Sequence, residues 1–175
     1  MKSIKHLLKE DKKSNSKSFF LKKKNFVVNS QIYNFLEDFY KKNFKTVRVC
    51  MHSKPSEKIH SMIILMGKNN FYAPHKHLLK KELYHIIKGS MAVILFSNNG
   101  RIKKIVKLIE NNIFITPVNV YHTMIPLSKF VIFHEIKSGP FIRKNNSLLP
   151  KWINKYSSSK DIDLFKKKVK GSLNA

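Results

Sequence analysis

Residues 74–89 read Pro-His-Lys-His-Leu-Leu-Lys-Lys-Glu-Leu-Tyr-His-Ile-Ile-Lys-Gly, and this stretch organises the rest of the chain. His75 and His77 are two residues apart, so on an extended strand their side chains point to the same side. Glu82 begins a second apolar run that ends at Gly89. Two imidazoles and one carboxylate can therefore converge within this stretch.

A third imidazole is His122, which follows Glu82 by 40 residues and lies in a short apolar segment between two prolines. Histidine and carboxylate side chains together are ligands that first-row metal ions accept. Ions of Fe, Mn, Zn, Ni and Co all suit such a set, so the residues do not select one of them. The sequence predicts one divalent transition metal with four ligands: His75, His77, Glu82 and His122.

The length of 175 residues corresponds to one domain of ordinary size. No run of about 18 apolar residues is present, and the first residues lack the apolar core of a secretory signal. The single cysteine, Cys50, excludes an internal disulfide framework. We therefore expect a cytoplasmic protein with no membrane span.

The formal net charge of +25 would ordinarily indicate a nucleic-acid or anionic-membrane partner. Of the 35 basic residues, however, only Arg48, Arg101 and Arg143 are arginines. Arginine is the side chain favoured for bidentate recognition of phosphates and bases. The excess of lysine, together with abundant Asn, Ile and Phe, is typical of an AT-rich coding sequence, so we expect no specific nucleic-acid partner.

Charge and apolar periodicity divide the chain into three parts. Residues 1–27 read as a basic flexible arm, residues 28–141 as the folded domain with a leading helix, and residues 142–175 as a basic C-terminal tail. Ser30 can cap the leading helix, whose apolar residues recur at helical spacing and should cover one side of the domain. Residues 161–169 are predicted to form a short C-terminal helix.

Turn signals separate eight or nine short strands, which favours an all-β sandwich or barrel. Ser97-Asn-Asn-Gly100 predicts a hairpin between two of them, because Asn and Gly tolerate positive φ. The expected strands are residues 46–52, 59–66, 71–77, 82–88, 91–96, 101–108, 112–116, 120–125 and 129–136.

The spacing His-x-His, four residues, Glu, six residues, Gly, followed later by Pro-x4-His, resembles the two motifs of the cupin superfamily. With Arg48-Val-Cys-Met-His52 and Phe133-His-Glu135, residues 28–141 look like the WbuC-type cupin metalloproteins, although Leu78 stands where that family usually has proline. The resemblance implies a small antiparallel double-sheet (jelly-roll) barrel. That family is associated with gene clusters for O-antigen and other surface polysaccharides, which implies a sugar or sugar-nucleotide ligand.

Three candidate functions follow. An enzyme, such as a metal-dependent isomerase or epimerase, would use Glu135, His60 or Tyr84 to move a proton. The alternatives are a binding or regulatory module that holds a sugar without converting it, and an iron-dependent dioxygenase. Lys80 lies between the ligands, where it could hold an anionic substrate or simply face solvent. A homodimer is left open.

Overall fold

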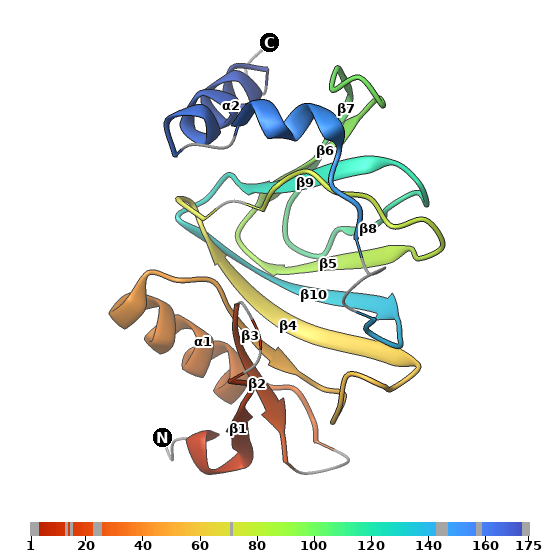
Figure 1. Cartoon of the computed structure of the whole chain (residues 1–175). Coiled ribbons are helices and arrows are strands. Elements are labelled where there is room, and N and C mark those ends of the chain that lie inside the picture. Colours follow the sequence, from red (N-terminus) through yellow and green to blue (C-terminus); the bar gives the residue numbers. More distant parts are fainter. Residues whose placement is uncertain are drawn as a thin grey trace.

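The computed structural model describes residues 4–12, 14, 16–22, 26–70, 72–142, 147–156 and 159–172. These residues form ten strands and two α-helices, with a short 3₁₀ helix near each end (Figure 1). The helical elements are η1 (Ile4–Leu7), α1 (Ser30–Asn43), η3 (Lys151–Tyr156) and α2 (Ser159–Gly171). The strands are β1 (Leu8–Glu10), β2 (Lys17–Leu21), β3 (Val47–Cys50), β4 (Ile59–Gly67), β5 (Glu82–Lys88), β6 (Met91–Phe96), β7 (Ile102–Leu108), β8 (Ile113–Ile115), β9 (Tyr121–Pro126) and β10 (Phe130–Ser138).

The strands form two sheets rather than one closed barrel. The larger sheet has the order β1-β2-β3-β4-β10-β5-β8, and the smaller has the order β7-β6-β9. The chain is therefore mostly β with two sheets, as the sequence predicts. The predicted hairpin is confirmed, since β6 pairs with β7 in antiparallel register.

One pairing differs from the expected antiparallel arrangement. Strands β2 and β3 are parallel, with Phe19 opposite Val49 and Phe20 opposite Cys50. Parallel neighbours need a crossover connection, because the chain must return to the same end of the sheet. Helix α1, which lies between β2 and β3 in sequence, is that crossover (Figure 1).

Helix α1 begins one residue after its cap. The Asn29 side chain, not that of Ser30, accepts a hydrogen bond from the Gln31 backbone N–H at 3.0 Å. At the other end, Phe44 has a left-handed φ of 52° and its N–H bonds the carbonyl of Tyr40. The buried side chains of α1 pack on the outer face of the larger sheet.

Strand β4 is buried on both faces. Met62, Ile64 and Met66 belong to the core between the two sheets, whereas Ile63 and Leu65 pack with α1 on the outer face. A strand covered on both sides reads as a continuous apolar run, because water meets neither face. Residues 62–66 have this pattern, Met-Ile-Ile-Leu-Met.

The described part of the N-terminal segment is not an arm apart from the domain. It adds η1, β1 and β2 to the larger sheet, and Ile4, Leu8 and Leu21 are buried against α1. Phe19 meets Phe35 of α1 edge to face, with ring centroids 5.3 Å apart. The abundant lysines concealed this apolar pattern, because an amphipathic strand with a lysine-rich solvent face has the composition of a flexible arm.

The C-terminal segment likewise covers a sheet. Phe165 and Val169 of α2 are buried against Phe96 of β6, and Trp152 of η3 lies 5.4 Å from the Phe96 ring. Elements η3 and α2 therefore close the outer face of the smaller sheet (Figure 1). Within the described residues, no helix has the length and apolar character needed to cross a membrane.

Candidate metal centre

The segment before β5 pairs with β9 of the smaller sheet at His75 and His122. The backbone N–H of each residue donates to the carbonyl of the other, at 3.0 and 2.9 Å. The strand predicted over residues 71–77 is reduced to two isolated bridges, at His75 and Lys76. Phe71, the first residue of that prediction, lies outside the described residues. His122 belongs to β9 of the smaller sheet, and Glu82 is the first residue of β5 in the larger one.

The four predicted ligands come together. One donor atom from each of His75, His77, Glu82 and His122 lies within 4.8 Å of the other three. His77 Nε2 is 2.9 Å from Glu82 Oε1, and His122 Nε2 is 3.2 Å from Glu82 Oε2. His77, Glu82 and His122 are buried, and His75 is partly exposed. The four ligand atoms therefore lie in a largely buried cluster, of which His75 is the most exposed member.

Backbone carbonyls fix the orientation of two of the imidazoles. Nδ1 of His75 is 3.0 Å from the carbonyl oxygen of Ala73, and Nδ1 of His122 is 3.0 Å from that of Val120. A carbonyl only accepts, so each Nδ1 carries the hydrogen and each Nε2 is the ring nitrogen that would bind a metal. This is the arrangement in which histidine ligates an ion, and the donor set fits a divalent transition metal.

Burial and neighbouring charges set the protonation of these groups. Burial lowers the pKa of His75 to about 4, so its imidazole is neutral at neutral pH, as a ligand must be. Burial by itself would lower the pKa of His122. The hydrogen bond to Glu82 and the charge of that carboxylate outweigh burial, so the pKa of His122 is raised. Burial opposes ionisation of Glu82, yet the charge of Lys137 and two histidine contacts hold the pKa of that carboxyl well below its usual range.

Tyr84 contacts Glu82 directly. It is fully buried, and its hydroxyl donates to Glu82 Oε2 at 2.5 Å. Burial and the charges of Glu82 and Glu135 raise the pKa of Tyr84 well above its ordinary value, so the phenol keeps its proton. This hydrogen bond holds one oxygen of the Glu82 carboxylate in place and thereby fixes the orientation of the Glu82 side chain.

A residue that sequence reasoning missed, Lys137, joins the centre to Glu135. Its Nζ lies 3.0 Å from Glu82 Oε1 and 2.8 Å from Glu135 Oε1. Burial opposes its charge, but the two carboxylates raise the pKa of Lys137, so it is an ammonium. The sequence does contain one indication of this position: Phe133, Glu135 and Lys137 alternate along one strand, so their side chains lie on the same face. The many other lysines of the chain hid this indication.

The structure does not bring His60 and Lys80 to the four ligands. His60 Nε2 lies 3.0 Å from the carbonyl oxygen of Pro55, and its ring stacks on that of His52 at 4.2 Å. Burial lowers the pKa of His60. Lys80 Nζ donates to the carbonyl of Pro140 at 2.7 Å in an exposed loop. Each side chain thus has a protein partner that accounts for its position.

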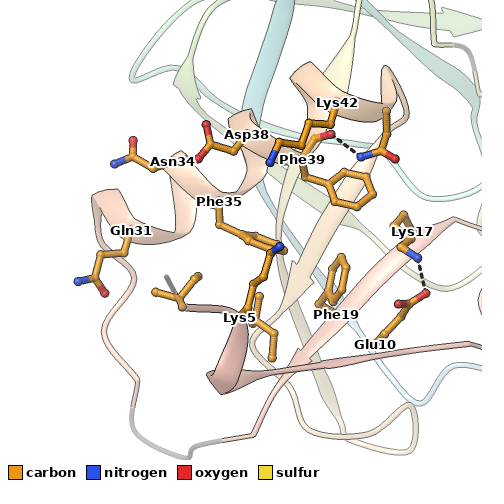
Figure 2. A pocket seen from close by; sticks show the side chains of 13 residues that line it. Lys5, Glu10, Lys17, Phe19, Gln31, Asn34, Phe35, Asp38, Phe39 and Lys42 are labelled. Carbon is orange, nitrogen blue, oxygen red and sulfur yellow. Dashed lines mark hydrogen bonds and ion pairs between the residues drawn. The ribbon is translucent and has the colours of Figure 1, made fainter. Parts of the chain in front are cut away.

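A separate groove of about 590 Å³ lies between α1 and the N-terminal strands, and none of the four ligands lines it (Figure 2). Phe19, Phe35 and Phe39 form its apolar side, and Lys5 and Lys42 extend along it. The groove results from packing a helix over short strands and shares no residue with the His/Glu cluster.

Comparisons with known families and structures give partial matches. The family described as "Domain of unknown function (DUF6016)" matches residues 42–108, less than half of the chain. A search of curated proteins finds no match.

Several solved structures resemble the fold. KdgF from Halomonas sp. is 15% identical with a TM-score of 0.46, and the match covers 57% of this chain and 83% of KdgF. A mutant of the Bacillus subtilis oxalate decarboxylase OxdC is 19% identical with a TM-score of 0.49, covering 69% of this chain but 32% of OxdC. A cupin superfamily protein from Desulfitobacterium hafniense is 10% identical with a TM-score of 0.45, covering 54% and 77% of the two chains.

Proposed function

We propose that this chain is a metal-binding cupin of the WbuC type that holds one divalent transition-metal ion with His75, His77, Glu82 and His122. One observation carries the proposal: four ligand atoms lie within 4.8 Å of one another in a buried site. Two of the imidazoles are held by backbone carbonyls in the tautomer that ligation needs. Fe, Mn, Zn, Ni and Co remain the candidate ions.

The ligand we propose is a sugar or sugar nucleotide from surface polysaccharide (O-antigen) biosynthesis, on the basis of the WbuC resemblance. An ion bound by three histidines and one carboxylate keeps open positions and supplies Lewis acidity to a carbonyl or vicinal diol. Tyr84 and Lys137 would orient Glu82 from behind. His75, the partly exposed ligand, marks the side from which the small molecule would enter.

If the protein is an enzyme, we propose an isomerase or epimerase in which Glu135 moves the proton. Glu135 is buried and is connected to Glu82 through Lys137 without being one of the four clustered ligands. A carboxylate close to a metal ion, yet not bound to it, is suited to act as a base. For that role, Glu135 would have to exchange its contact with Lys137 for one with the substrate.

A specific observation favours a second candidate, a module that binds a sugar without converting it. Each group expected to move a proton already has a protein partner: Glu135 binds Lys137, Tyr84 binds Glu82, and His60 binds the carbonyl of Pro55. A binding protein needs no free ionisable group beside the ion. An iron-dependent dioxygenase is the third candidate, and it requires that the bound ion be iron.

The deciding experiment is metal analysis of protein purified without chelators, followed by incubation with a panel of nucleotide sugars. We expect about one divalent ion per chain, lost in the double variant His75→Ala/His77→Ala. His85→Ala is the matched control, because His85 lies on β5 outside the four-residue cluster. Full metal content in the double variant would refute the site. Product analysis by NMR then separates an enzyme from a binding module.

A further inference from the structure

The loop between His77 and Glu82 exposes two leucines beside the metal centre. Leu78 is 52% exposed and Leu79 is 91% exposed. The sequence here is His-Leu-Leu-Lys-Lys-Glu, so two apolar side chains are followed directly by two lysines. Leu79 is too exposed to contribute to the core, although it lies only two residues from His77.

Three other segments are hydrogen-bonded to residues 76–80, and each of them also exposes apolar side chains. The Asn119 N–H donates to the His77 carbonyl at 2.8 Å, Lys80 Nζ donates to the Pro140 carbonyl at 2.7 Å, and Lys76 and Leu148 exchange two backbone hydrogen bonds. We call the exposed set the apolar rim: Leu78, Leu79, Val118, Phe141, Leu148 and Leu149. In Figure 1, the loop before β5 and the segment leading to η3 lie on the right of the view.

The charges around the apolar rim have one sign. Lys80 and Lys81 lie in the loop itself, Lys76 comes directly before His77, and Lys151 follows Leu149 closely. Segments 75–81, 117–121, 140–142 and 147–152 contain no acidic residue. Glu82 comes next in sequence but is buried. Exposed apolar side chains mark interaction sites when they gather in one area, and here the area is flanked by cations.

We propose that the apolar rim docks on the surface of an anionic lipid bilayer. Apolar side chains that enter the headgroup region and lysines that contact anionic lipids are the two contributions that hold a protein on such a surface. A second copy of the chain fits less well, because two chains of formal charge +25 repel each other. Docking in this way turns the partly exposed His75 side of the metal centre toward the bilayer.

Binding to vesicles tests the charge contribution. Vesicles of phosphatidylcholine with phosphatidylglycerol should bind the full chain, and vesicles of phosphatidylcholine alone should not. The variant Lys80→Gln/Lys81→Gln should weaken binding by about fivefold for each lysine. The control Lys103→Gln/Lys104→Gln changes net charge equally on the exposed part of β7 and should have a smaller effect. Equal losses in both variants would overturn the proposal and indicate unspecific attraction.

A fluorescent label tests which surface enters the bilayer. Cys50 is 3% exposed and burial raises its pKa to about 11, so a maleimide dye should label Leu79→Cys selectively. An environment-sensitive dye at this position should shift to the blue on anionic vesicles. The same dye on Ile109→Cys, a position 62% exposed and outside the apolar rim, should not shift.

A blue shift at both labelled positions, or at neither, would contradict docking through the rim. A blue shift at Leu79→Cys and none at Ile109→Cys is also expected after treatment with EDTA, since docking does not need the ion. The outcome is therefore independent of the metal assignment.

Discussion

Lys137 Nζ lies 3.0 Å from Glu82 Oε1, beside the four predicted metal ligands. The two residues face each other across paired strands, because Lys137 of β10 is the register partner of Glu82 of β5. The same ammonium binds Glu135 at 2.8 Å. One largely buried cation thus balances two buried carboxylates, and its removal leaves both of them without that charge.

We expect Lys137→Met to destabilise the chain by about 3 kcal/mol in the absence of metal, because breaking one side of a buried ion pair strands the other charge. A divalent ion should restore part of the loss, since it supplies positive charge next to Glu82. Urea unfolding with and without added metal measures both effects. Lys103→Met, on an exposed position of β7, is the control and should stay within about 0.5 kcal/mol of the parent. An unchanged stability for Lys137→Met would show that the pair contributes nothing.

Glu135→Gln separates catalysis from binding. The amide keeps the size of the side chain but cannot take a proton, so an enzyme that uses Glu135 as its base should lose turnover and keep its metal. A binding module should show a modest change in sugar affinity and no conversion in either form. Calorimetric titration, metal analysis and product analysis by NMR distinguish these outcomes. Loss of the metal would instead make Glu135 a ligand and require the role of Glu82 to be revised.

His52 should make stability depend on pH. Burial and the adjacent His60 lower the pKa of His52 to about 4, below its ordinary value of 6.5. Between these values the unfolded chain binds a proton that the folded chain does not, so stability falls as the pH drops from 6.5 toward 4. The slope contributed by this one group is at most about 1.4 kcal/mol per pH unit.

Replacing His52 by asparagine tests this prediction. The amide can bond to the Ser61 backbone as Nδ1 does, at 3.2 Å from its carbonyl, but it does not titrate. Urea unfolding at several pH values in EDTA should give a shallower pH dependence for His52→Asn than for the parent chain. EDTA removes the separate effect of metal loss, and parallel curves would mean that His52 is not the group responsible.

Leu21→Ala tests whether the N-terminal strands belong to the domain. Leu21 ends β2 and is 5% exposed, so its truncation should cost about 2–4 kcal/mol of unfolding free energy. Val27, which is 75% exposed, offers the matched control Val27→Ala with little expected change. Equal stability in the two variants would instead support the expectation from the sequence that residues 1–27 are a flexible arm.

Local patterns in the sequence predicted the hairpin between β6 and β7, the helix that begins at Ser30, and the residues of the His/Glu cluster. Each depends on short-range chemistry: turn residues that accept positive φ, apolar spacing that matches a helix, and two histidines on one side of an extended segment. His122 was included because Pro117-x4-His122 resembles the second cupin motif. These features require no knowledge of which strands become neighbours.

Only the tertiary structure decided the parallel pairing of β2 with β3, the packing of α2 on the smaller sheet, and the position of Lys137. In a chain with 35 basic residues, composition does not separate a lysine that contacts buried carboxylates from one that faces solvent. That distinction depends on register, because only the pairing of β10 with β5 brings Lys137 opposite Glu82. Register is set by contacts between segments more than forty residues apart, and local sequence does not contain it.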